Sequence, residues 1–349
     1  MVRSLARASQ NARAIAGIFV FACAFLLQGC ATPQFDALHT HFPAELPRHV
    51  ELEQIPYYAQ EAHQCGPATL AMTFAAAGVA VEPEQLESEV YLPEKLGSLQ
   101  VEMLAATRRH GLLAYTIEPQ MSALLAEIAA GRPAIVLLNL GLSWYPVWHY
   151  AVVIGYDIDN TELILRSGPE RRQLFPMRTF EHTWARSQYW AMLTLPPNQL
   201  PAHPDETRYI DAALALEQTH QTHAAHLAYT TAMQRWPDNL NASMGAGNTA
   251  YARGDFAAAE NAFLRATQTH PDSGAAFNNL ADTLARQNQL ELALAAAQQA
   301  VKLGGPQLSV FLQTQQEIEN QLAAAQSSVK KTTDTPAKTK STTKSDTRP

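Results

Sequence analysis

The sequence contains only three cysteines among 349 residues: Cys23, Cys30 and Cys65. So few thiols exclude a disulfide-stapled fold, because small secreted domains of that kind are rich in cysteine. The pattern GxxxxGKS/T, whose loop cradles nucleotide phosphates, is also absent. The chain therefore carries no ATP-binding segment of this type, although its 47% hydrophobic content and its length suffice for two domains with ordinary cores.

Basic residues are scarce in the body of the chain. The net charge is −7, and the basic residues concentrate at the two ends, which leaves residues 30–325 at −14. Binding of a polyanion needs a basic surface, so this balance argues against nucleic acid as a partner. Residues 326–349 form a low-complexity Lys/Thr-rich tail with almost no apolar side chains, and we expect this tail to be disordered.

Long apolar runs are missing except near the N-terminus. Residues 14–27 form a 14-residue run that follows three Arg and ends in "LLQGC". A membrane-spanning helix needs about 20 residues, so the run is typical of a signal peptide over residues 1–29. The ending resembles a bacterial lipobox, which implies cleavage before Cys30 and lipidation of that cysteine. Ala31 stands where Asp would favour retention in the inner membrane, so the resemblance implies a lipid anchor in the outer membrane, facing the periplasm.

The chain divides by composition after this segment. Residues 30–50 are expected to be a tether, and residues 51–195 mix helical and strand patterns. Within the latter, the apolar run at 133–141 predicts a buried strand, and residues 149–168 predict two strands joined by the turn "DIDN". These patterns favour an α+β domain. The Pro-rich polar stretch 196–206 predicts a linker.

A 34-residue period marks the helical region that follows. Pro237 and Pro271 lie 34 residues apart, and small residues recur at fixed offsets upstream of each. This period resembles that of tetratricopeptide repeats and implies an all-α solenoid over 207–325, closed by a capping helix at 307–322. Gly247 lies where two helices would cross closely. The repeats would bind a protein partner or an extended part of a substrate.

Three histidines, His220, His223 and His226, are spaced three residues apart on one predicted helix. A metal site would need converging ligands and a further partner, which the sequence does not supply. We interpret them as a solvated polar face, and we expect no metal ion or cofactor.

One cysteine remains for chemistry. Once the signal peptide and the lipid account for Cys23 and Cys30, Cys65 is left alone at the start of a predicted helix in "QEAHQCGPATLAM". It could be a small buried residue that packs as a hydrophobe. It could also be a nucleophile whose pKa is lowered by the helix start and by a nearby histidine.

The order of three residues decides between these interpretations. Gln60 precedes Cys65 by five residues, and His149 opens the apolar strand "HYAVVIGYD". This pattern resembles papain-like cysteine peptidases of the bacteriocin-processing type, which cut after double-glycine leader peptides. The resemblance covers 51–195. It implies that Gln60 binds the oxyanion, Cys65 is the nucleophile, and His149 is the general base and acid.

The third member of that family's site is missing. The family has an Asp on the strand after the histidine strand, whereas this chain has "LRSGPE" there. Asp157 would lie about 26 Å from His149 along an extended strand, at about 3.3 Å per residue. A hairpin centred near 158–159 places residues 167–168 across from His149, so Ser167 is the candidate orienting group. A hydroxyl stabilises a charged imidazole less than a carboxylate does.

The sequence thus predicts a cell-envelope cysteine peptidase that hydrolyses a peptide or protein through an acyl-enzyme on Cys65. Two alternatives stay open. The fold could bind peptides without cutting them, as an adaptor, which the missing Asp favours. The nucleophile could also serve transpeptidation or amide transfer. Trp144, Tyr145 and Trp148 are expected either to wall the cleft or to pack internally.

Overall fold

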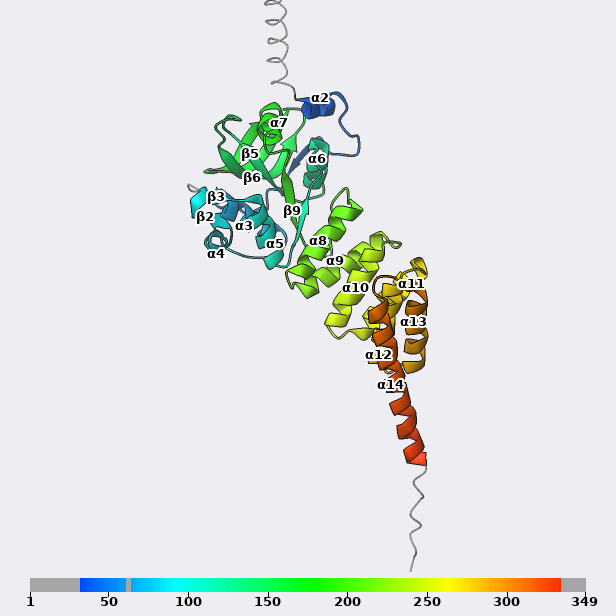
Figure 1. Cartoon of the computed structure of the whole chain (residues 1–349). Coiled ribbons are helices and arrows are strands. Elements are labelled where there is room, and N and C mark those ends of the chain that lie inside the picture. Colours follow the sequence, from blue (N-terminus) through cyan, green and yellow to red (C-terminus); the bar gives the residue numbers. More distant parts are fainter. Residues whose placement is uncertain (1–31, 61–63, 334–349) are drawn as a thin grey trace, which may run out of the picture. The chain divides into compact units, whose positions relative to one another are not determined.

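The computed structural model describes residues 32–60 and 64–333, with side chains up to residue 327. The chain divides into two compact units, with the boundary between Gln221 and Thr222 (Figure 1). Cys30 and the predicted signal peptide lie outside the described residues, so the lipobox stays a prediction. Among the helices of the described part, none is both long and apolar enough to cross a membrane.

The first unit is built on an antiparallel sheet. Its strands lie in the order β4 (Leu113–Thr116), β9 (Ala191–Leu195), β5 (Ala134–Asn139), β6 (Trp148–Asp157), β7 (Glu162–Ser167) and β8 (Glu170–Pro176). β1 (His49–Glu51) pairs with the end of β6 that β5 does not reach. The buried strand predicted at 133–141 and the two strands predicted within 149–168 are confirmed as β5, β6 and β7.

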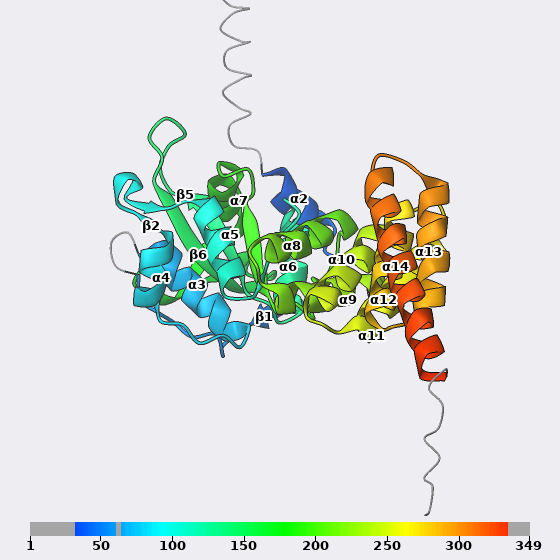
Figure 2. The ribbon, with the colours of Figure 1, turned by 60° about the horizontal axis from the view of Figure 1, so that its bottom comes forward.

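Helices cover both faces of this sheet (Figures 1 and 2). One face carries α3 (Cys65–Ala76), α4 (Pro83–Val90) and α5 (Gln100–Arg109), and the other carries α6 (Met121–Ala129) and α7 (Met177–Ala185). A short hairpin of β2 (Tyr91–Leu92), a 3-10 turn (Pro93–Lys95) and β3 (Gly97–Ser98) connects α4 to α5.

Helix α3 is the central helix of the unit. It is apolar on all sides, and the residues from Gly66 to Phe74 are buried. Leu70 and Phe74 join a core that includes Ile135 of β5 and Tyr150 of β6. The helix ends just before Gly78, whose φ of +84° is the left-handed conformation that glycine adopts at helix ends. The core thereby fixes Cys65, at the first turn of α3, against the middle of the sheet.

The N-terminal segment is fixed to the domain, although we expected a tether over 30–50. Helix α2 (Pro33–Thr40) packs on α6 and α7 and buries Phe35. The N–H groups of Gln34 and Phe35 donate to the buried carboxylate of Glu181 at 3.0 and 2.7 Å. The first N–H groups of a helix have no partner within the helix, and a carboxylate satisfies them well. This pairing holds the described part of the segment in place.

The segment predicted as a linker, 196–206, is also bonded to the first unit. The N–H of Ala202 donates to Glu127 Oε1 at 2.7 Å, and the N–H of Asp205 donates to the Tyr115 hydroxyl at 3.2 Å. Helix α8 (Glu206–Gln218), expected as the first helix of the repeats, packs on β4 and belongs to this unit. The Pro-rich polar composition predicted a linker, but buried carboxylate and hydroxyl acceptors fix this backbone to the first unit.

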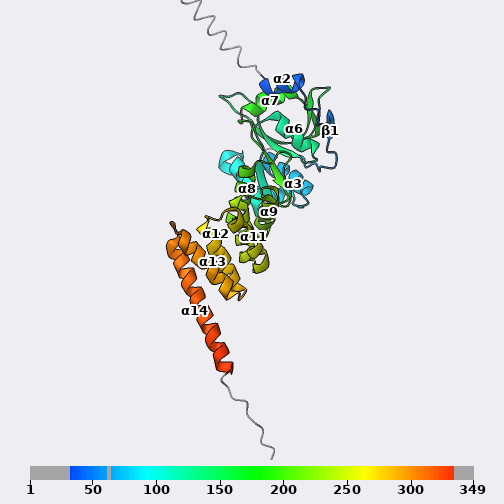
Figure 3. The same ribbon diagram turned by 90° about the vertical axis from the view of Figure 1, so that its right-hand side faces the viewer.

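The second unit is a stack of helices. They are α9 (Thr222–Arg235), α10 (Leu240–Ala252), α11 (Phe256–Thr269), α12 (Gly274–Arg286), α13 (Leu290–Leu303) and α14 (Leu308–Thr333). Each helix packs on the next (Figure 3). The capping helix predicted at 307–322 corresponds to α14, but α14 continues to Thr333, so the first eight residues of the tail predicted to be disordered are helical.

Small residues set the spacing of this stack. A Cβ added to Gly247 of α10 would lie 2.4 Å from the ring of Phe263 of α11, and a Cβ at Gly245 would lie 2.5 Å from the ring of Tyr229. The close crossing predicted at Gly247 is therefore confirmed. Each aromatic ring packs directly on the helix backbone, which fixes the distance between neighbouring helices.

We expect Gly247→Ala to destabilise the second unit by about 1–3 kcal/mol, because the new methyl overpacks the contact with Phe263. Helix propensity alone would favour alanine by about 1 kcal/mol, so a loss of stability identifies the steric contact. Thermal unfolding followed by circular dichroism measures the change. The double variant Gly247→Ala/Phe263→Leu should recover most of the loss, and a stabilised single variant would contradict the contact.

Candidate active site

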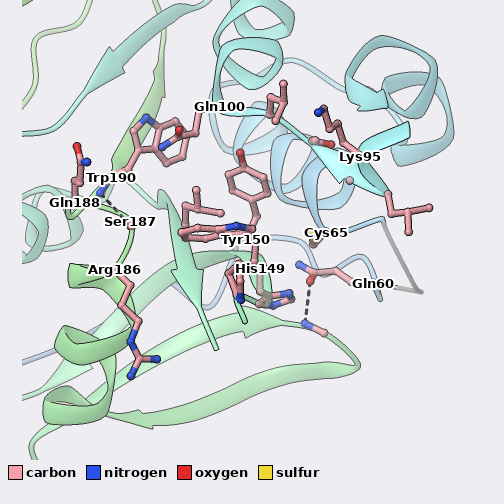
Figure 4. A pocket seen from close by; sticks show the side chains of 18 residues that line it. Gln60, Cys65, Lys95, Gln100, His149, Tyr150, Arg186, Ser187, Gln188 and Trp190 are labelled. Carbon is pink, nitrogen blue, oxygen red and sulfur yellow. Dashed lines mark hydrogen bonds between the residues drawn. The ribbon is translucent and has the colours of Figure 1, made fainter. Parts of the chain in front are cut away.

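A cavity of 1180 Å³ opens beside the start of α3 in the first unit (Figure 4). We call it the cleft. Its floor is formed by the start of α3 and by β5 and β6, and its walls are the β2–β3 hairpin and residues 186–190. Three of the four predicted catalytic residues, Gln60, Cys65 and His149, line it, and Ser167 hydrogen-bonds to one of these. The fold therefore brings residues from widely separated parts of the sequence to one place.

Cys65 is the first residue of α3 and is half-buried. The backbone N–H groups of Tyr150, Gly66 and Cys65 itself are directed at its sulfur. Tyr150 directly follows His149 in β6, so this contact sets the thiol against the strand that carries the histidine. Gly66 is required next to the cysteine, because a Cβ there would lie 2.2 Å from the Ser98 hydroxyl oxygen.

His149 is held by Ser167. The Nε2 atom of His149 and the Ser167 hydroxyl oxygen form a hydrogen bond of 2.9 Å, and Ser167 is buried. With Nε2 engaged, any proton that the ring exchanges with another group passes through Nδ1. Ser167 thus occupies the position of an orienting group. Asp157 lies at the other end of β6, where the N–H and the side-chain amide of Asn160 donate to it.

The strand register differs from the one we predicted. Val152 faces Arg166, and a bulge lies between Val153 and Gly155, so continuing this register would put His149 opposite residue 169 rather than 167–168. A second irregularity lies at Ser167, between β7 and β8. The Ser167 hydroxyl therefore reaches His149 diagonally. Asp157 faces Glu162, so the turn of the hairpin is centred about one residue later than we predicted, and the bulge beside Gly155 moves the register back by one residue toward the prediction.

Gln60 lines the cleft, and the two ends of its side-chain amide differ in their hydrogen bonding. Its Oε1 accepts the N–H of Gly168 at 3.0 Å, and its own N–H donates to the Gly168 carbonyl at 3.1 Å (Figure 4). These bonds fix the orientation of the carboxamide. Its Nε2 is buried and has no hydrogen-bond partner among the residues that the structure describes. An unpaired buried donor costs about 1–3 kcal/mol, so this amide is suited to an acceptor that arrives with a ligand.

The resting pair is neutral, and this corrects our expectation of a lowered pKa for Cys65. Burial raises the pKa of the Cys65 thiol, and the three N–H groups at its sulfur oppose this only in part. Burial also lowers the pKa of His149 below its ordinary value of 6.5. The helix start was the correct feature, but desolvation disfavours both charged forms, and Ser167 supplies no charge to compensate. The cleft therefore holds a thiol and a neutral imidazole.

Only one of the three aromatic residues predicted for the loop between β5 and β6 lines the cleft. Trp148 lines the cleft, whereas Trp144 and Tyr145 are 80% and 70% exposed and are not among the residues that line it. Asn139 builds this loop, because its Oδ1 accepts the N–H groups of Gly141 and Val147 at 3.0 and 2.9 Å. Neither internal packing nor a wall of the cleft accounts for the two exposed rings.

Several residues that line the cleft were not identified in the sequence analysis. The hydroxyls of Ser98 and Tyr150 are buried and have no hydrogen-bond partner within the described part of the chain. Trp190 lines the cleft and packs edge-on against Tyr150 at 5.8 Å. Arg186 also lines the cleft. No sequence motif marks these residues, although Tyr150 could have been inferred from its place beside His149 on a strand with alternating faces.

Comparisons with known proteins agree with this architecture. Residues 52–192 match the model of the Peptidase_C39 like family. Residues 210–266 and 245–307 each match a tetratricopeptide-repeat model, and the first of these matches begins within α8. The chain therefore contains a peptidase-like α+β domain followed by helical repeats, as the sequence predicted. The curated protein sequences gave no significant match.

Solved structures resemble the two parts separately. A crystal structure from Bacillus anthracis, described as that of a C39-like peptidase, is 17% identical with a TM-score of 0.37, over 42% of this chain and 96% of that one. YrrB, a tetratricopeptide-repeat protein with an unusual peptide-binding site, is 28% identical with a TM-score of 0.27, over 29% and 52%. The first tetratricopeptide repeat of Spaghetti, bound to an HSP90 peptide, is 16% identical with a TM-score of 0.32, over 34% and 93%.

The neutral pair makes a prediction about thiol reactivity. At pH 7 iodoacetamide should alkylate Cys65 more slowly than the cysteine of the unfolded chain, because its thiolate is disfavoured by burial. The Ser167→Asp variant should react faster than the parent at the same pH, since a carboxylate at Nε2 raises the pKa of His149 and an imidazolium lowers that of the thiol. Ser167→Asn is the uncharged control and should resemble the parent. Equal rates for the Asp and Asn variants would contradict the predicted electrostatics.

Proposed function

We propose that the first unit is a cysteine peptidase that hydrolyses a peptide bond through an acyl-enzyme on Cys65. The observation that carries this proposal is the unpaired Nε2 of Gln60, fixed by Gly168 in the cleft that also holds Cys65. Together with the N–H of Cys65 at the start of α3, it provides two donors for an oxyanion. A cysteine that merely packed would not need them.

The chemistry follows from the positions of the side chains. His149 takes the proton of the thiol as the sulfur attacks the carbonyl carbon, and the N–H of Cys65 and Nε2 of Gln60 bind the resulting oxyanion. His149 then returns the proton to the leaving amine. Water, deprotonated by His149, releases the acid from the thioester and restores the thiol. Ser167 keeps Nε2 occupied and leaves Nδ1 for these transfers.

The neutral orienting group Ser167 limits how well the site can stabilise an imidazolium at His149. A carboxylate would stabilise the imidazolium that forms during attack, whereas the hydroxyl of Ser167 stabilises it less. This feature favours the second candidate function, a peptide-binding adaptor that retains the peptidase fold without turnover. In both cases the repeats recruit a protein partner or an extended part of the substrate, as their stacked helices suit extended chains. The resemblance to leader peptidases supports a peptide as the ligand.

Gln60→Ala separates the two functions. In a peptidase it should lower kcat for a peptide substrate by about 10²–10³-fold, because one oxyanion donor is lost. Alkylation by iodoacetamide forms no tetrahedral oxyanion, so its rate should change less than about threefold. Cys65→Ala gives the baseline, and turnover is measured with a mixture of proteome-derived peptides analysed by mass spectrometry. Peptide binding by the parent, without cleavage above that baseline, would support the adaptor instead.

We further propose that the chain is anchored by a lipid on Cys30 in the outer membrane. Only Ala31 separates Cys30 from Thr32, which is buried against the first unit, so the extended link spans no more than about 7 Å. The domain would then lie close to the membrane. With the native signal, Cys30→Ser should remain unprocessed by the lipoprotein signal peptidase and should not incorporate labelled palmitate. Normal acylation of that variant would show that another residue carries the lipid.

A further inference from the structure

The charge of the cleft is opposite to that of the protein around it. Residues 30–325 carry a net charge of −14, yet Lys95 and Arg186 line the cleft and none of its described lining residues is Asp or Glu. Within the ranges that the structure describes, neither cation forms an ion pair. At physiological ionic strength charges act over about 8 Å, so a ligand in the cleft experiences the two cations that line it.

Arg186 is held in place without losing its charge. Its Nη1 donates to the backbone carbonyls of Asn139 and Gly141 at 3.0 and 2.6 Å. Both acceptors are neutral, so the positive charge is not balanced. The side chain is exposed at the cleft, and its other two nitrogens have no hydrogen bond to the described residues. A guanidinium fixed at one corner presents its remaining donors in a planar fork, which suits a carboxylate.

The wall that carries Arg186 is rigid. Gln188 and Tyr189 both have a left-handed backbone, with φ of +58° and +57°, which non-glycine residues rarely adopt. The indole N–H of Trp184 donates to the Trp190 carbonyl at 2.9 Å, and the Ser187 hydroxyl donates to the Trp184 carbonyl at 2.7 Å. These bonds hold the strained segment in one shape, so little conformational entropy is lost when Arg186 binds a ligand.

We infer that Arg186 determines specificity and selects peptides with a carboxylate near the cleaved bond. This inference rests on the proposed peptidase function and adds the class of its substrate. Lys95, on the β2–β3 wall across the cleft, adds charge of the same sign (Figure 4). A carboxylate could come from an Asp or Glu side chain or from the C-terminus of a short peptide. The two sources share the same chemistry, and the experiment distinguishes them.

The full chain is first incubated with a proteome-derived peptide mixture, and the cleavage sites are identified by mass spectrometry. We expect Asp and Glu to be enriched within three residues of the cleaved bond. Two internally quenched peptides built on the best site, which differ only in Glu or Gln, should then differ about tenfold in kcat/KM. A third peptide with Gln and a free carboxylate close to the bond tests the C-terminal source. The difference should shrink at 1 M salt.

Variants assign the preference to Arg186. In Arg186→Gln the Glu peptide should lose its advantage over the Gln peptide, so that the ratio of their kcat/KM values falls to less than twofold. Arg186→Lys should keep part of the preference. Arg171→Gln changes the charge equally on exposed β8 outside the cleft, and it should keep all of the preference. A preference that survives in Arg186→Gln, or is absent from the parent, overturns the inference.

The two proposals fail in different ways. If neither peptide is cleaved, the peptidase proposal fails, and the charge preference is then measured as binding of fluorescent Glu and Gln peptides to the Cys65→Ala variant. Tighter binding of the Glu peptide that depends on Arg186 would support the inference without catalysis. Equal binding of both peptides would overturn it. Thermal unfolding of every variant confirms that the compared proteins are folded.

Discussion

The packing of helix α3 against strand β6 is the contact on which the site depends. The helix is apolar on all sides and is therefore buried at the centre of the unit, which fixes its first residue, Cys65, against the sheet. The same contact directs the Tyr150 N–H at the sulfur and leaves room only for glycine at position 66, where Ser98 lies. The thiol, the histidine strand and the β2–β3 wall are thus positioned by one piece of core packing.

Burial determines the charge state of the two titratable groups in the site, and hydrogen-bond donors surround them. Burial raises the pKa of Cys65 and lowers that of His149, so both groups rest uncharged. Backbone and side-chain donors around them are arranged for charge that would develop only when a ligand is present, most clearly the unpaired Nε2 of Gln60. If the proposed peptidase function holds, the site relies on preorganised donors rather than on a resting ion pair.

The two units use different means to reach a fixed geometry. The first relies on buried polar anchors such as Glu181, whose carboxylate holds the start of α2, and Asn139, which builds the loop beside the cleft. The second relies on small residues, with Gly245 and Gly247 receiving the rings of Tyr229 and Phe263. A repeat needs the same contact at each step, and a small residue beside an aromatic ring provides it.

The sequence by itself determined the domain classes, the buried strand β5, the helical repeats, and the candidate residues Gln60, Cys65 and His149. These follow from patterns that are local, namely apolar runs, a 34-residue period and a short motif at a helix start. It also identified Ser167 as the residue within reach of His149, although it did so from a hairpin centred about one residue too early.

Only the tertiary structure decided the rest, because it depends on what lies next to each group in space. Desolvation made the Cys65–His149 pair neutral, and no sequence pattern reports how deeply a residue is buried. The 30–50 and 196–206 segments were predicted from their composition to be a tether and a linker, yet acceptors from distant helices and strands fix their described parts. The charge of the cleft likewise arises from the meeting of Lys95 and Arg186, which lie 91 residues apart in sequence and line one cavity.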